Sequence, residues 1–155
     1  MERSATRRLK VYLAAPLFTQ HERSWNRELA LRLERGLGCS VTLPQEIPVS
    51  SGAPVAKEAA RIFRQCLAGL DACDVVVAVL DGPDADSGTA FEVGYAYALG
   101  KPVVGVRTDF REQQDHGTNL MLGRSCSAFV RPGAFDDDLN ALAAALVRQV
   151  RRVMR

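Results

Sequence analysis

Apolar and polar positions change their period repeatedly along the chain, and each change predicts a new element. Short runs of apolar and β-branched residues predict strands that are covered on both faces. Stretches in which apolar residues recur every three or four positions predict amphipathic helices. The predicted strands are residues 10–15, 40–43, 74–80, 102–107 and 127–130. The predicted helices are residues 24–37, 55–72, 88–99 and 136–154, and residues 109–125 are expected to form a loop with a short helix.

This alternation of strands and helices predicts a parallel sheet, because parallel neighbours need a crossover connection that a helix normally supplies. We therefore expect the α/β class, with a doubly wound, flavodoxin-like domain whose five-stranded parallel sheet carries helices on both faces. With the strand order 2-1-3-4-5, a ligand binds outside the carboxyl ends of the first and third strands. The sequence thus predicts a site built from residues 14–19 and 81–92.

Length and composition limit the number of domains and the kinds of molecule that the protein is expected to bind. The chain has 155 residues, and we expect one domain over residues 1–155, because a chain of this size fits a single core. Lys plus Arg number 20 and Asp plus Glu number 18, a net charge of +2, which gives no reason to expect a nucleic-acid polymer. The chain contains no apolar run long enough to cross a membrane and no apolar segment typical of a signal peptide, so we expect neither a membrane nor secretion.

The four cysteines give no sign of a metal site or a disulfide framework. Cys39, Cys66, Cys73 and Cys126 are scattered, and no CxxC pair brings two of them together. Disulfides persist mainly in oxidising compartments, so we interpret all four as reduced thiols in a cytoplasmic protein. We expect no metal and no cofactor.

Four carboxylates gather after the third predicted strand: Asp81, Asp84, Asp86 and Glu92. Crowded carboxylates repel each other, so such a cluster typically binds a cation or a polyhydroxy ligand, or uses one carboxylate in chemistry. Glu92 is the candidate nucleophile, because the dipole of a helix N-terminus favours an ionised carboxylate. Gly88, in the same segment, lets the backbone approach a ligand closely.

Purely structural interpretations compete at these positions. Thr89 and Glu92 have the spacing of a capping box, in which the threonine caps the helix and the glutamate bonds back to the N–H of the cap. Asp81, Asp84 and Asp86 also fit a solvated turn, because aspartate is a common turn residue. The sequence leaves both interpretations open.

Three segments occur in a characteristic order along the chain. They are residues 11–18 (VYLAAPLF), 86–96 (DSGTAFEVGYA) and 117–121 (GTNLM). Together they resemble the signature segments of the nucleoside 2-deoxyribosyltransferase family. The resemblance implies an enzyme that moves the 2-deoxyribosyl group of a deoxynucleoside to a free nucleobase. In that chemistry a glutamate attacks C1′ and expels one base, and a second base then attacks the glycosyl-enzyme.

The resemblance also implies roles for single residues. Glu92 matches the nucleophile, and Tyr12 matches a tyrosine close to it, although an ordinary strand tyrosine is the competing interpretation. Asp86 matches an aspartate that binds the sugar 5′-hydroxyl, which favours nucleosides because a carboxylate repels a 5′-phosphate. Gln45 matches a glutamine that reads the base, and Asn119 a residue that a neighbouring subunit supplies. Further substrate contacts are expected at Gly88, Ala15 and Phe18.

One position departs from the family pattern. Cys66 stands where many members carry an aspartate that shuttles a proton to the leaving base, and a neutral thiol is a poor replacement for a carboxylic acid. Cys66 also fits a core position beside Phe63, Leu67 and Leu70. Asp81, at the end of the third strand, is the candidate general acid in its place.

The sequence leaves three functions open. The first is a deoxyribosyltransferase that takes a deoxynucleoside and a free nucleobase. The second is a nucleoside or nucleotide N-glycosidase, in which water attacks the same intermediate. The third is a non-catalytic module that senses nucleotides. Because the match to Asn119 implies a residue shared between subunits, we also expect a homo-oligomer with shared sites.

Overall fold

A five-stranded sheet forms the centre of the computed structural model, which describes residues 7–112 and 117–155. All strand pairs are parallel, and the order is β2-β1-β3-β4-β5. The strands are β1 (Lys10–Ala14), β2 (Ser40–Thr42), β3 (Val75–Val79), β4 (Val103–Val106) and β5 (Ala128–Val130). The strand order and the parallel pairing confirm the doubly wound α/β fold expected from the sequence.

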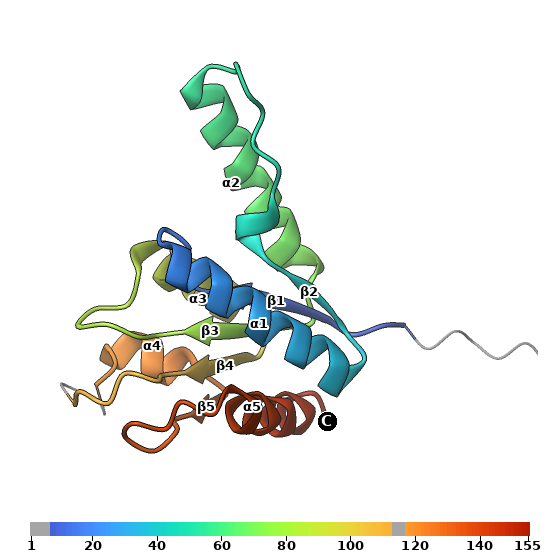
Figure 1. The fold of residues 1–155 in the computed structure, drawn as a ribbon. Helices are drawn as coiled ribbons and strands as arrows, with labels where there is room; N and C mark the ends of the chain where they lie inside the picture. Colours follow the sequence, from blue (N-terminus) through green and yellow to red (C-terminus); the bar gives the residue numbers. More distant parts are fainter. Residues whose placement is uncertain (1–6, 113–116) are drawn as a thin grey trace, which may run out of the picture.

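Helices connect the strands and cover both faces of the sheet (Figure 1). They are α1 (Gln20–Leu37), the 3-10 turn η1 (Pro44–Glu46), α2 (Val55–Ala72), α3 (Ser87–Ala98), α4 (Leu120–Ser125) and α5 (Leu139–Val153). Helix α4 is the short helix expected within residues 109–125, of which residues 113–116 lie outside the described part. Among the described residues, no helix combines the length and the apolar character that a membrane span requires.

Successive residues of the central strands face opposite layers, as the pleat of a strand requires. Leu13 packs in the layer that α1 and α5 cover, whereas Tyr12 and Ala14 pack in the layer that α2 and α3 cover. Every residue of β3 is buried, because this strand lies in the middle of the sheet and is covered on both faces. The side chain of Tyr12 is completely buried, so its hydroxyl is directed toward the α2–α3 layer.

Caps explain why two helices begin where they do. Helix α1 begins at Gln20, earlier than predicted, because Thr19 and Glu22 form a capping box: each side chain accepts a hydrogen bond from the other's backbone N–H. Helix α5 begins at Leu139, later than predicted, because the Asp138 side chain accepts the first free backbone N–H groups.

Helix α2 stands away from the sheet along most of its length (Figure 1). Its last turns reach β1 because Gly69 has no side chain; a Cβ there would lie 3.0 Å from Cε2 of Tyr12. Within α2, Leu70 is the one apolar residue that is fully buried. Val55 and Phe63 are 86% and 52% exposed, so this helix presents apolar side chains to solvent.

Candidate active site

Tyr12 and Glu92 meet in the α2–α3 layer, although 80 residues separate them in the sequence. The Tyr12 hydroxyl, on the middle residue of β1, donates to Oε1 of Glu92 over 2.5 Å. Glu92 lies in the second turn of α3 and is partly buried. Among the described residues, the second carboxylate oxygen of Glu92 has no hydrogen-bond partner.

Burial dominates the electrostatics of this pair. It raises the pKa of Glu92 to about 7; the hydrogen bond from Tyr12 lowers that pKa, and the nearby charge of Asp86 adds to the rise. Burial and the charge of Glu92 raise the pKa of Tyr12, so the phenol keeps its proton. The rise in the pKa of Glu92 opposes the expected effect of the helix dipole, and Glu92 lies in the second turn of α3, beyond the first turn in which the dipole mainly acts.

The cap of α3 is Asp86. Its Oδ2 accepts from the backbone N–H of Thr89 over 2.8 Å and from the Thr89 hydroxyl over 3.1 Å, so the helix begins at Ser87. The interpretation of Thr89 and Glu92 as a capping box is thus wrong, since Asp86 takes the place of the threonine. Glu92 is left free for its contact with the Tyr12 hydroxyl.

Gly88 stands directly against the cap. A Cβ at this position would lie 3.1 Å from Oδ2 of Asp86, so a larger residue would crowd the carboxylate. Among the described residues, Oδ1 of Asp86 has no hydrogen-bond partner and is available to a ligand. After β1, Ala15 is buried and Phe18 is 72% exposed.

Cys66 is another side chain close to Tyr12 and Glu92. It projects from α2, one turn before Gly69, and its thiol lies close to the Tyr12 hydroxyl. Burial raises the pKa of Cys66, so the thiol stays protonated. Of the residues on the same face of α2, Leu70 is fully buried and Phe63 is half exposed, and Cys66 itself is partly buried close to Tyr12 and Glu92.

Asp81 has a different environment. Its Oδ1 accepts from the backbone N–H groups of Thr108 and Asp109, over 2.6 and 3.0 Å, and its Oδ2 accepts from the Thr108 hydroxyl over 2.6 Å. These bonds tie the loop after β3 to the loop after β4. Asp81 also lines a cleft of about 370 Å³ with Trp25 and Asn26 from α1, and among the described residues it makes no contact with Glu92.

Gln45 and Asn119 both have structural partners. The Gln45 amide accepts from Nδ2 of Asn26 over 3.0 Å and donates to the carbonyl of Arg23 over 2.8 Å, which fixes its orientation in η1. Oδ1 of Asn119 accepts from the backbone N–H of Met121 over 2.9 Å and caps α4 at an exposed position. Neither residue contacts the candidate nucleophile within the described part of the chain.

The sequence patterns did not single out Gly69, although its place inside a predicted helix is a sign of a close contact. A glycine in the interior of a helix destabilises it relative to alanine, so such a residue often marks a close approach. Here it lets α2 lie against Tyr12 and Thr42. Tyr95 was missed as well: its hydroxyl donates to Oδ1 of Asp71 over 2.8 Å and fastens α3 to the end of α2.

Within residues 7–112 and 117–155, no three His, Cys, Asp or Glu side chains are placed to hold a metal ion.

Residues 11–121 match the family model for nucleoside 2-deoxyribosyltransferase. The chain belongs to this family. The family acts on small nucleosides and nucleobases, and membership supports an enzyme that transfers a glycosyl group or cleaves an N-glycosidic bond. The comparison with curated protein sequences gave no match.

Solved structures of similar fold agree with this membership. A conserved protein from Enterococcus faecalis V583 is 26% identical, with a TM-score of 0.74, over 94% of this chain and 99% of that one. A 2-deoxyribosyltransferase from Bacillus psychrosaccharolyticus is 26% identical, with a TM-score of 0.67, over 89% of this chain and 95% of that one. The CMP N-glycosidase BcmB of Clostridium botulinum shares the fold at 17% identity and a TM-score of 0.58, over 92% and 98% of the two chains.

The raised pKa of the Glu92 carboxyl should make the free energy of unfolding depend on pH. Its pKa is about 7 in the fold and near 4.5 in the unfolded chain, so the folded state binds more protons between these values and loses stability as pH rises through them. The Glu92→Gln variant lacks this loss. Urea unfolding should show the variant gaining roughly 1–3 kcal/mol over wild type at pH 8 relative to pH 5. A difference that is the same at both pH values would contradict the raised pKa.

Proposed function

We propose that the protein transfers the 2-deoxyribosyl group of a deoxynucleoside from one nucleobase to another, with Glu92 as the nucleophile. The observation that carries this proposal is the hydrogen bond from Tyr12 to Glu92, within segments that match the family model. A buried carboxylate that is held by one oxygen and free at the other is suited to form a covalent intermediate.

The first half of the reaction forms a glycosyl-enzyme. A carboxylate oxygen of ionised Glu92 attacks C1′, the C1′–N bond breaks, and the electron pair leaves with the base, which takes up a proton from solvent water. The negative charge of Glu92 disappears in the ester that results. Tyr12 keeps its proton throughout, because its pKa is raised, and its hydrogen bond holds the carboxylate in one orientation.

The second half of the reaction regenerates the free enzyme. A ring nitrogen of the acceptor base attacks C1′, the C1′–O bond to Glu92 breaks, and the carboxylate reforms while the acceptor loses its proton. Both displacements invert C1′, so the product keeps the configuration of the substrate. An N-glycosidase would use the same intermediate with water as the acceptor.

Asp86 supports a nucleoside as the substrate. Its Oδ1 is free among the described residues, and a carboxylate oxygen accepts a hydrogen bond from the 5′-hydroxyl of a sugar. The same charge repels a 5′-phosphate. Gly88 leaves space beside this carboxylate, in agreement with a role for both residues at the sugar.

Exposed apolar side chains support a homo-oligomer. Phe63 on α2 and Phe91 on α3 are about half exposed and contact each other, with ring centroids 6.1 Å apart. Met121, next to the exposed Asn119, is 74% exposed. A second copy of the chain that covered these faces would also bring its Asn119 toward a neighbouring site, as the family resemblance implies.

The test is an assay with deoxyinosine, with and without free adenine, followed by chromatography of bases and nucleosides. We expect deoxyadenosine to form only when adenine is present, and deoxyinosine monophosphate to react more slowly than deoxyinosine. Hypoxanthine released at a rate that adenine does not change would favour the N-glycosidase. The absence of turnover over a panel of deoxynucleosides and deoxynucleotides would favour a sensing module.

A further inference from the structure

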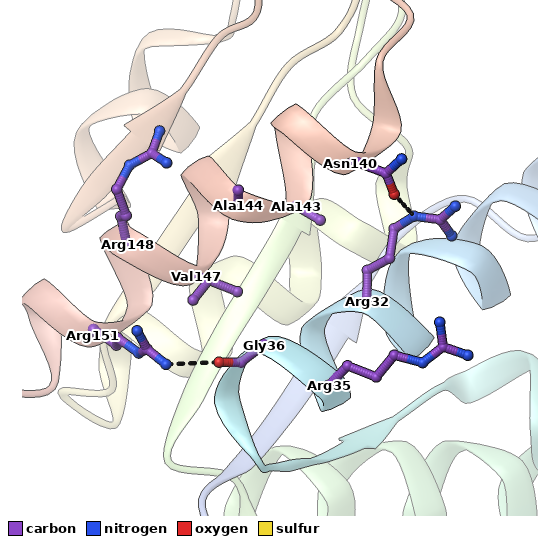
Figure 2. Close-up of a pocket in the computed structure, with 9 residues that line it drawn as sticks. All are labelled: Arg32, Arg35, Gly36, Asn140, Ala143, Ala144, Val147, Arg148 and Arg151. Atoms are coloured by element: carbon purple, nitrogen blue, oxygen red, sulfur yellow. Dashed lines mark hydrogen bonds between the residues drawn. The ribbon is translucent and has the colours of Figure 1, made fainter.

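A cleft of about 580 Å³ lies between α1 and α5, on the face of the sheet opposite the Tyr12–Glu92 pair. Figure 2 shows Arg32 and Arg35 of α1 on one side of it and Arg148 of α5 on the other, with small side chains of α5 between them. Its apolar floor is formed by Gly36, Ala143, Ala144 and Val147. The cleft is open to solvent, and Arg35 and Arg148 at its sides are exposed.

Two arginines fix the geometry of the cleft by joining the helices. Nε of Arg32 donates to Oδ1 of Asn140 over 2.8 Å, and Nη2 of Arg151 donates to the carbonyl of Gly36 over 2.8 Å (Figure 2). The helices also pack closely, since a Cβ on Gly36 would lie 2.7 Å from Cγ2 of Val147. The two sides of the cleft are therefore held at a set separation.

The other two arginines are uncompensated. Among the described residues, neither Arg35 nor Arg148 makes a hydrogen bond or ion pair, and no carboxylate lines the cleft. Glu28 pairs with Arg32 from outside it. Favourable placement near a helix C-terminus accounts for Arg35 and Arg151, which lie in the last turns of α1 and α5, but Arg148 lies outside them.

We propose that this cleft binds a small molecule that carries several phosphate groups. Guanidinium groups pair with phosphate oxygens through two parallel hydrogen bonds, which makes arginine the preferred residue for such ligands. Arginines stand on both sides of the apolar floor, with Arg32 and Arg35 on α1 and Arg148 and Arg151 on α5 (Figure 2), so a phosphate chain that lies across the floor can be reached from both helices. The binding is independent of the proposed transfer reaction, because the cleft shares no residue with that site.

Isothermal titration with inorganic tripolyphosphate at low salt tests the proposal. The variant that combines Arg35→Gln and Arg148→Gln should bind at least about tenfold more weakly than wild type, because it loses two charged hydrogen-bonding groups. The matched control combines Arg27→Gln and Arg64→Gln, two exposed arginines outside the cleft, and should bind like wild type. Both variants lose the same charge.

The outcomes separate the possibilities. No binding to wild type, or an equal loss in both variants, would overturn the proposal, since the second result indicates only general charge attraction. A parallel titration with dATP distinguishes two sources of the same chemistry: tighter binding than tripolyphosphate indicates a nucleotide with its ring on the floor, and equal binding indicates the phosphate chain alone. A DNA duplex that displaced tripolyphosphate more effectively than dATP would overturn the assignment to a small molecule.

Discussion

Replacing Glu92 with glutamine should abolish base exchange, lowering kcat by on the order of 10⁴-fold or more, as expected when a covalent nucleophile is removed. The amide oxygen of glutamine is a far weaker nucleophile than a carboxylate and cannot form the neutral glycosyl ester. It still accepts the hydrogen bond from Tyr12, so the fold and the position of α3 should be kept. Initial rates with deoxyinosine and adenine, together with circular dichroism, measure both effects.

A control and a direct observation of the intermediate make this result decisive. Glu112→Gln changes the same group at a side chain that is 74% exposed and should leave the rate unchanged. Wild type incubated with deoxyinosine alone should gain the mass of one deoxyribosyl group on the peptide that contains Glu92, and the Glu92→Gln variant should not. Base exchange at the wild-type rate in that variant would refute Glu92 as the nucleophile.

Replacing Cys66 with aspartate should accelerate the exchange by up to about 10²-fold, at the lower end of the contribution of a general acid. The thiol stays protonated and is a weak acid, whereas a carboxyl beside Glu92 and Tyr12 would be held partly protonated by burial and by the neighbouring negative charge. Such a carboxyl can give its proton to the leaving base. Rates for purine donors between pH 5 and 8 test this, because the gain should be largest at low pH.

The control for this substitution is Cys66→Ser. A serine hydroxyl is similar in size to the thiol and can hydrogen-bond with Tyr12, but it cannot act as a carboxylic acid. We expect it to behave like wild type. Equal rates in the aspartate and serine variants would show that proton transfer to the base does not limit the reaction at this position.

Local periodicity was sufficient to predict the sheet. The run from Val75 to Leu80 is continuously apolar and β-branched, and the structure buries it in the middle of five parallel strands. Parallel pairing then follows from the helices between the strands, and the strand order limits where a ligand can bind. The signature around Glu92 and the match at Tyr12 indicated two residues that the fold does bring together.

The remaining details depend on contacts between distant segments, which spacing does not report. The capping-box pattern at Thr89 and Glu92 was chemically reasonable, yet Asp86 caps the helix because it precedes Thr89 by three residues. Cys66 has the spacing of a core residue, and the fold places it, partly buried, close to Tyr12 of a distant strand. Asp81 remains only a candidate acid from sequence, and its three hydrogen bonds in the loops give it a structural role instead.

The attachment of α2 at one end has a thermodynamic consequence for the reaction. The part of α2 that holds Cys66 against Tyr12 is anchored by Gly69 and Leu70, while its first turns carry the exposed Val55. Such a segment can open locally without unfolding the sheet. Any surface that covers α2 shifts this opening equilibrium by mass action. In the homo-oligomer proposed above, a partner chain over α2 would hold the site assembled, and activity per molecule should then rise as the chains associate.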